Sequence, residues 1–167
     1  MLPLCLILGD STAVGTADAL VAQGVQCAVH ARVGASSTEA LRTFRGNAPV
    51  ERAVIGLGSN DPANPQLVRN LVALRQRLSA VRVTWLAPYN PSAAQATVAI
   101  ARSFGDDVVH LSSVATRDRV HPVSYRQVAS SLRWLGSPMV SSGYRVSPLA
   151  TRPPPTPAVR EAVVLSF

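Results

Sequence analysis

The sequence predicts one α/β domain built on a parallel sheet. Short apolar runs alternate with segments of helical periodicity from residue 2 to about residue 135, the pattern of strands joined by crossover helices. With 167 residues and 47% hydrophobic content, the chain can bury a substantial core. None of the apolar runs approaches the roughly 20 residues that cross a bilayer, so we expect no membrane span.

The first two strands are expected at residues 4–8 and 25–29, where the first apolar runs lie. Between them, a helix from Thr12 to about Gln23 is expected to end at Gly24, because glycine is a common helix terminator. The next helix runs to Phe44. Ser36 or Ser37 can cap it, and Glu39 suits its first turn.

The third, fourth and fifth strands are expected at residues 53–57, 81–86 and 108–111. The helix between the third and fourth begins near Pro65, a favourable first-turn residue. Its apolar stripe has helical spacing and consists of Leu67, Val68, Leu71, Leu74 and Leu78. A helix from Ser92 to Phe104 precedes the fifth strand, and a last helix runs from about residue 124 to 135, closed by Gly136.

The C-terminal part differs in composition from the rest. Residues 137–167 are rich in proline and end in a strand-like run at 163–167. We therefore expect residues 1–136 to form the domain and residues 137–167 to form a proline-rich arm with a short terminal strand. A proline-rich arm builds no core of its own. It is either a strap on its own domain or an attachment arm whose strand adds to a protein partner.

Cysteines, histidines and charge restrict the function classes. Cys5 and Cys27 lie in separate apolar runs, which favours buried free thiols over a disulfide or a metal cluster. His30 closes the second predicted strand and His110 lies within the fifth, and we interpret both as structural. Zinc sites need clustered ligands, and we expect neither a metal nor a cofactor.

All 16 basic residues are arginines, and the formal net charge is +7. An acidic partner is conceivable. The arginines are scattered without interleaved aromatic residues, which argues against a specific nucleic-acid site. The N-terminus lacks the basic region and cleavage site of a signal peptide. We therefore expect a protein of the cytoplasm or of a phage particle.

Polar residues that could act in chemistry follow the predicted strands. Ligands of open α/β sheets bind beyond the carboxyl ends of the strands, where Ser11, Gly34 and Asn60 follow the first three strands. A serine at a strand-to-helix turn can be a nucleophile and can offer its N–H to an oxyanion. It can equally be a helix N-cap, just as Gly34 and Asn60 also suit simple turns.

After the fifth strand, Asp118 precedes His121 by three residues. An aspartate at this spacing can accept the Nδ1–H of the imidazole, so that Nε2 faces a serine. Alone, the two residues could be a surface ion pair. Four such loops in order at one end of one sheet favour a catalytic site.

These blocks resemble the SGNH hydrolases, also called GDSL esterases. The resemblance extends over roughly residues 4 to 135 and depends on Gly9-Asp10-Ser11, Gly34, Gly58-x-Asn60-Asp61 and Asp118-x-x-His121-Pro122. It implies a flavodoxin-like three-layer α/β/α sandwich with a five-stranded parallel sheet. It also implies a catalytic triad of Ser11, His121 and Asp118, and an oxyanion hole formed by the N–H groups of Ser11 and Gly34 and the side chain of Asn60.

The expected function is hydrolysis of small acyl esters. We favour acetyl esters on a carbohydrate such as a cell-wall polysaccharide. Long acyl chains need a deep apolar pocket, which makes a lysophospholipase or thioesterase the second enzymatic reading. The other alternative is a structural or attachment component, for example of a phage particle, that retains the hydrolase fold. The expected partner is a small-molecule or glycan ester, together with a possible protein partner for the arm at residues 137–167.

Overall fold

The computed structural model describes residues 5–134, which form a five-stranded, all-parallel sheet. Its strands are β1 (Cys5–Gly9), β2 (Ala28–Ala31), β3 (Val50–Gly56), β4 (Ala80–Ala87) and β5 (Asp107–His110). The strand order is β2-β1-β3-β4-β5, which is the flavodoxin-like order with a switch point between β1 and β3. The predicted fold class is therefore confirmed.

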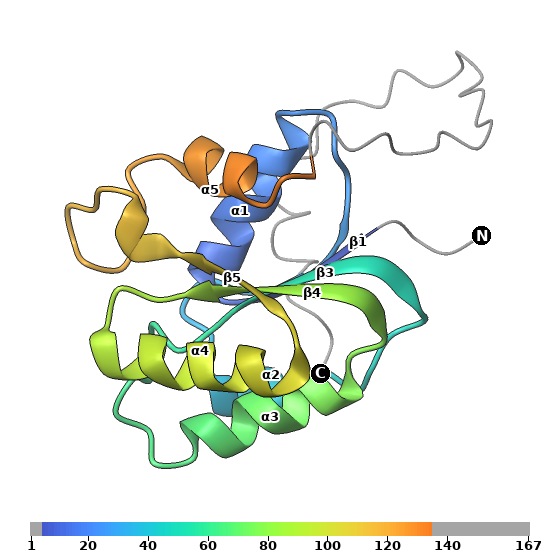
Figure 1. The fold of residues 1–167 in the computed structure, drawn as a ribbon, viewed down its shortest axis with the longest axis vertical. Coiled ribbons are helices and arrows are strands. Elements are labelled where there is room, and N and C mark those ends of the chain that lie inside the picture. Colours follow the sequence, from blue (N-terminus) through green and yellow to red (C-terminus); the bar gives the residue numbers. More distant parts are fainter. Residues whose placement is uncertain (1–4, 135–167) are drawn as a thin grey trace.

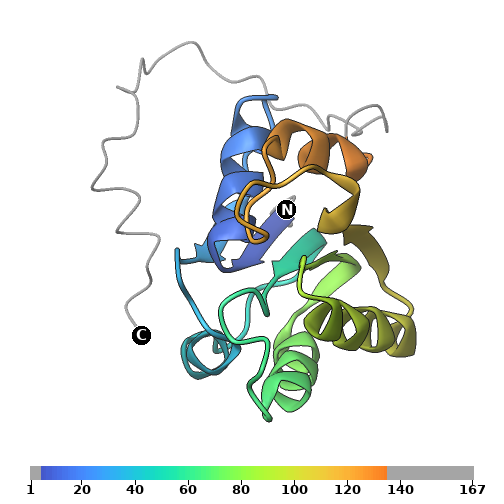
Figure 2. The same ribbon diagram turned by 90° about the vertical axis from the view of Figure 1, so that its left-hand side faces the viewer.

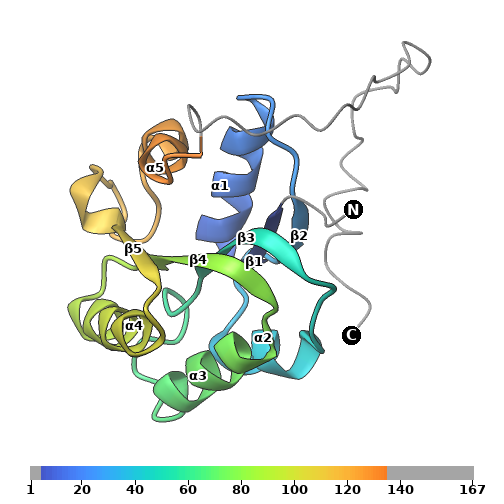
Figure 3. The ribbon, with the colours of Figure 1, turned by 45° about the vertical axis from the view of Figure 1, so that its right-hand side comes forward.

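Five α-helices cover the two faces of the sheet. They are α1 (Ser11–Val21), α2 (Ser37–Thr43), α3 (Leu67–Arg77), α4 (Pro91–Phe104) and α5 (Tyr125–Ser131), and a short 3-10 helix, η1 (Leu111–Ser113), follows β5. Helices α1 and α5 lie on one face, and α2, α3 and α4 lie on the other (Figure 1; Figure 3). The result is a three-layer sandwich.

Alternation along β1 divides the core into two layers. Leu6 and Leu8 pack toward α2, α3 and α4, whereas Cys5 and Ile7 pack toward α1 and α5. Strand β1 and the carboxyl-terminal parts of β3 and β4 are buried on both faces, which explains why these central strands are apolar runs in the sequence, whereas the edge strands β2 and β5 are partly exposed. This double-sided packing holds the carboxyl ends of β1, β3 and β4 in fixed positions.

Several element boundaries differ from the predictions. Strand β3 begins at Val50 instead of at residue 53. Strand β2 begins at Ala28, because Val25 instead donates its N–H to the carbonyl of Leu20 and closes the end of α1. The last helix ends at Ser131, several residues early, and Arg133 follows with a positive φ of 54°. In α3, Leu67, Leu71 and Leu74 are buried as predicted, but Val68, which was predicted to share their stripe, is 52% exposed.

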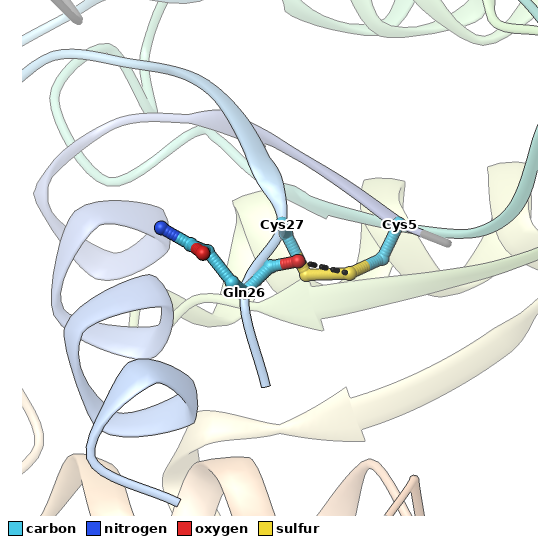
Figure 4. The surroundings of a disulfide bond; sticks show 3 residues. All are labelled: Cys5, Gln26 and Cys27. Atoms are coloured by element: carbon cyan, nitrogen blue, oxygen red, sulfur yellow. Dashed lines mark hydrogen bonds between the residues drawn. A yellow bond between two sulfur atoms is a disulfide. The ribbon is translucent and has the colours of Figure 1, made fainter. Parts of the chain in front are cut away.

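The prediction that Cys5 and Cys27 are free thiols is wrong. The two residues form a disulfide with 4.8 Å between their Cα atoms (Figure 4). Parallel pairing of β1 with β2 places Leu6 opposite Ala28, and the residue before each of these is a cysteine. Separation in the sequence therefore hid an adjacency that the strand order creates. The disulfide ties the start of β1 to the segment that enters β2.

Some predictions fall outside the described part of the chain. The arm at residues 137–167, its terminal strand and Gly136 lie there, as does Leu4 of the first predicted strand. Within residues 5–134, no helix is long and apolar enough to cross a membrane.

Candidate active site

A glycine at the end of β1 makes the turn before Ser11 possible. Gly9 has a φ of 150°, and a Cβ at this position would lie 1.9 Å from the carbonyl oxygen of Gly56 on β3. The next residue, Asp10, donates its N–H to that same oxygen at 2.8 Å. Only glycine allows this close approach of two backbones. The chain can therefore leave the sheet directly into α1.

Asp10, and not Ser11, is the N-cap of α1. Its Oδ1 accepts hydrogen bonds from the backbone N–H of Thr12 at 2.8 Å and from the Thr12 hydroxyl at 2.7 Å. Ser11 is the first helical residue and is 9% exposed. The capping alternative for Ser11 is therefore excluded by its position, since the aspartate satisfies the helix end. The Ser11 hydroxyl is left for another partner.

That partner is carried by a turn after η1. In this turn, Thr116 and Pro122 form an isolated antiparallel bridge, and the Thr116 hydroxyl donates to the carbonyl of His121 at 2.8 Å. Arg119 takes a positive φ of 61° at the tip. Figure 2 shows this gold-coloured loop beside the first turn of α1. The two segments are far apart in the sequence, and they meet at the carboxyl edge of the sheet.

A continuous chain of hydrogen-bonding atoms joins Ser11, His121 and Asp118. The Ser11 Oγ lies 2.9 Å from the His121 Nε2, and the His121 Nδ1 lies 2.6 Å from the Asp118 Oδ2. If Nδ1 carries the proton and donates it to the carboxylate, Nε2 presents a lone pair to the serine hydroxyl. This geometry is the one required for a base that removes the serine proton.

Asp118 is held as a carboxylate although it is exposed. The backbone N–H of His121 donates to its Oδ1 at 2.7 Å, and the backbone N–H of Val120 donates to the same atom at 2.9 Å. The His121 backbone bond, then its side-chain bond, hold the pKa of Asp118 well below its usual range. Asp118 therefore stays ionised at neutral pH, ready to orient the imidazole.

Asp10 shows the opposite behaviour. Burial raises the pKa of its carboxyl from 3.8 to about 6, and hydrogen bonds from Thr12 and approach of Ser59 only partly oppose the rise. Within residues 5–134, its Oδ2 has no hydrogen-bond partner. A buried carboxylate with one unpaired oxygen is destabilised relative to its protonated form. The residue beside Ser11 therefore titrates near neutrality.

Gly34 and Asn60, the other predicted site residues, lie in adjoining loops. The Asn60 Nδ2 donates to the carbonyl of Ala35 at 3.0 Å, next to Gly34, whose φ is 79°. Among the described residues, the N–H groups of Ser11 and Gly34 take part in no hydrogen bond. Ser59, which precedes Asn60, approaches Asp10 beside the serine turn. The three loops that carry these donors are thus in mutual contact.

Polar side chains that the sequence did not single out for a role fix these loops. The Oδ2 of Asp61 accepts from the backbone N–H of Ser37 at 3.0 Å and from its hydroxyl at 2.5 Å. Arg32 forms a two-point ion pair with Glu39 and also donates to the carbonyl of Val33. The first link joins the Asn60 loop to α2, and the second holds the Gly34 loop against α2. Asp61 belongs to the asparagine block, although no role was predicted for it, and no motif signals the Arg32–Glu39 pair.

The remaining histidines lie outside this hydrogen-bonded chain. The His30 ring meets the Phe44 ring edge-on with 5.1 Å between centroids, and its Nε2 lies 3.3 Å from the Thr43 hydroxyl. Burial lowers the pKa of His30 to about 4, which keeps it neutral. His110 is exposed at the end of β5. The described residues contain no group of three or more potential ligands that could hold a metal ion.

Comparisons with known proteins give structural likeness without sequence relatives. No family model matches the chain, and no curated protein does. A carbohydrate acetylesterase from Sinorhizobium meliloti is similar with a TM-score of 0.55 and 12% identity, over 78% of this chain and 98% of that one. An aryl esterase from M. smegmatis also has a TM-score of 0.55, with 14% identity, over 78% of this chain and 96% of that one.

A third solved structure is the C-terminal catalytic domain of peptidoglycan O-acetyltransferase A from Streptococcus pneumoniae, with a methylsulfonyl adduct. It has a TM-score of 0.57 and 16% identity, over 80% of this chain and 92% of that one. At these identities the shared property is the fold. The chain thus has the three-layer fold of solved esterase and acetyl-transfer domains and carries a Ser–His–Asp chain of contacts at its switch-point edge.

Proposed function

We propose that this protein is a serine esterase in which Ser11 is the nucleophile, His121 the general base and Asp118 the residue that orients the base. The observation that carries the proposal is the unbroken contact sequence from Ser11 Oγ to His121 Nε2 at 2.9 Å and from His121 Nδ1 to Asp118 Oδ2 at 2.6 Å. The first distance suits proton transfer from the serine to the imidazole, and the second suits the hydrogen bond by which the carboxylate orients the imidazole. The fold shared with solved esterases supports the same reading.

The proposed reaction has two acyl-transfer steps. His121 takes the proton of Ser11 as its oxygen attacks the ester carbonyl, and then gives that proton to the departing alcohol. Water, activated by the same imidazole, attacks the acyl-enzyme and releases the acid and the free serine. No metal or cofactor is required for these steps.

The negative charge that develops on the carbonyl oxygen needs nearby donors. The N–H of Ser11 is at the N-terminus of α1, where the helix dipole adds to its effect. We assign the N–H of Gly34 and the second N–H of the Asn60 amide as the other donors. The first amide N–H is engaged by Ala35, and this bond supports the assignment because it fixes the orientation of the amide.

The open surroundings of the triad favour a small acyl group. The side chains of His121 and Asp118 are 44% and 53% exposed. A cavity of about 470 Å³ is lined by Arg52, Arg82 and Trp134, among others, and so lies away from the triad. Long acyl chains need a deep apolar pocket next to the nucleophile. We therefore propose acetyl esters, carried on a carbohydrate, as substrates; the carbohydrate acetylesterase among the similar structures agrees with this choice.

The test is hydrolysis of p-nitrophenyl esters and acetylated glycans by the wild type and Ser11→Ala. We expect the rate of hydrolysis by Ser11→Ala to fall to the uncatalysed background rate. Ser103→Ala is the matched control, because Ser103 is exposed on α4 and bonds only to the carbonyl of Ile100. Activity retained in Ser11→Ala would refute the nucleophile. Faster hydrolysis of octanoyl than of acetyl esters would refute the small acyl group.

A further inference from the structure

A tyrosine ring occupies the space that a side chain on Gly15 would need. A Cβ on Gly15 would lie 2.4 Å from the Cζ of Tyr125 and 2.6 Å from both Cε atoms. Gly15 lies within α1 and does not have the positive φ that would itself call for glycine. Alanine is the better helix former at such a position. The absence of a side chain therefore serves the contact with Tyr125.

The contact lies close in the sequence to both members of the Ser11–His121 pair. Gly15 is four residues after Ser11 on α1, and Tyr125 is four residues after His121 and begins α5. Figure 3 shows α1 and α5 side by side on one face of the sheet, where they pack together. Any change in the separation of the two helices at this point therefore moves the His121 loop relative to Ser11.

The tyrosine hydroxyl makes a second, weaker link. It donates to the carbonyl oxygen of Ser11 over a long distance of 3.5 Å. Burial, followed by the nearby carboxylates of Asp10 and Asp118, raises the pKa of Tyr125 to about 12. The hydroxyl therefore stays protonated and remains a donor over the whole range in which an esterase would work.

We propose that Tyr125 and Gly15 form a spacer that sets the distance between Ser11 Oγ and His121 Nε2, which makes Tyr125 a positioning residue. The ring acts as a wedge of fixed thickness between α1 and α5. The hydrogen bond from its hydroxyl to the carbonyl of Ser11 helps to orient the ring. The consequence for turnover rests on the proposed function, whereas the placement of the His121 ring does not.

A double-mutant cycle tests the spacer. Gly15→Ala pushes the ring away, and we expect it to lower kcat on p-nitrophenyl acetate by about 10- to 100-fold with KM nearly unchanged, since a displacement of about 1 Å has effects of this size. Tyr125→Ala removes the wedge without a clash and should also lower kcat. In the Tyr125→Ala background, Gly15→Ala should cause no further loss of kcat and should raise Tm. Gly15→Ala should therefore lower Tm in the wild type and raise it in the Tyr125→Ala background. This reversal is expected only if the tyrosine ring is what excludes the methyl group.

Two controls separate positioning from general packing. Val128→Ala truncates a fully buried residue of α5, and it should lower Tm while kcat stays within about threefold of wild type. Tyr125→Phe keeps the ring and loses the long hydrogen bond, so it should retain most of the activity. Equal loss of kcat in Val128→Ala and Gly15→Ala at equal loss of Tm would overturn the inference, as would additive effects in the cycle.

A readout without substrate distinguishes this inference from the proposed function. The imidazole Cε1–H resonance of His121 should shift in Gly15→Ala, while those of His30 and His110 act as internal references and stay in place. If the wild type lacks Ser11-dependent hydrolysis, the proposed function fails, and the shift of His121 alone decides on the spacer. An unchanged His121 resonance in a folded Gly15→Ala variant would overturn it.

Discussion

Two carboxyl groups flank the Ser11–His121 contact, and they differ in both exposure and ionisation. Asp10 is fully buried, and its pKa is raised to about 6. Asp118 is exposed, and its pKa is depressed. Exposure to water alone would leave the pKa of Asp118 near its usual value. Its depression is therefore due to three N–H donors. The comparison teaches that directed donors lower the pKa of a carboxyl where water reaches it, whereas burial outweighs such donors at Asp10.

The same comparison separates two tasks. The Asp118 turn holds a charge at the surface in order to orient His121, and this turn contributes little to the core. The Asp10 turn is built into the sheet edge and shapes the start of α1, at a cost when its carboxyl ionises. We therefore expect substitutions in the Asp118 turn to affect turnover and substitutions around Asp10 to affect stability.

The largest effect is expected for Asp118→Asn. An asparagine leaves the shape of the turn but no longer holds the imidazole in the right tautomer, so kcat should fall by up to about 10⁴-fold, while Tm changes little. Steady-state kinetics and thermal unfolding measure the two effects. Asp107→Asn is the control, because Asp107 is likewise exposed but begins β5 at the other end of the strand. Near-normal turnover in Asp118→Asn would contradict the assigned role.

The second-largest effect on kcat is expected for Asn60→Ala. Loss of one oxyanion donor lowers kcat by about 10²- to 10³-fold in comparable sites, and we expect KM to change less. Asn47→Ala is the matched control: its side chain bonds to the backbone of Ser79, and both residues precede strands, at the end of the sheet opposite the site. It should reduce stability without reducing kcat. Equal kinetic effects of the two substitutions would refute the oxyanion assignment.

Replacing both Cys5 and Cys27 by alanine tests the buried side of the comparison. The disulfide spans 22 residues, and a crosslink of this length contributes about 3 kcal/mol in the chain-entropy model. The free energy of unfolding, measured in urea, should fall by about that amount. The folded fraction should retain the wild-type kcat at room temperature. Two free thiols in the denatured, unreduced wild type would contradict the disulfide.

Asp10→Asn should give an effect no larger than that of removing the disulfide, and it should be the most pH-dependent one. Because the folded protein raises the pKa of Asp10 from 3.8 to about 6, the folded state binds this proton more tightly than the unfolded state. The stability that the proton provides is present below about pH 4 and is lost as the pH rises through about 6, a loss of about 3 kcal/mol for the wild type. The side chain of asparagine is neutral at every pH, so the Asp10→Asn variant does not lose this stability as the pH rises.

Urea unfolding at about pH 4 and about pH 8 measures the difference between Asp10→Asn and the wild type. We expect the variant to gain stability relative to the wild type between these two conditions. Asp107→Asn, an exposed substitution of the same chemistry, should show a nearly constant difference. An Asp10→Asn difference that is equal at both pH values would mean that folding does not raise the pKa of Asp10.

The sequence predicted the parts of the molecule that depend on local pattern. Apolar runs marked all five strands, most clearly the central ones, because strands buried on both faces are continuous in composition. The His121 turn was also visible, since Asp118 and His121 are neighbours in the chain and their contact is local. The shared sheet edge followed from the rule that parallel strands end together.

Features that depend on strand order or on packing were not predicted. The Cys5–Cys27 bond requires that β1 and β2 are neighbours in register, which two separate apolar runs do not reveal. The capping role of Asp10 was missed because serine and aspartate are both good caps. The match of Gly15 to Tyr125 joins residues more than a hundred positions apart, and only the packing of α1 against α5 reveals it.

The central claim, that His121 and Asp118 activate Ser11, is tested most directly by a fluorophosphonate probe with peptide mass mapping. We expect the wild type to be modified on the peptide that contains Ser11, Ser11→Ala to remain unmodified, and His121→Ala to react far more slowly. Modification of Ser11→Ala at the wild-type rate, or an unmodified and fully folded wild type, would contradict the account.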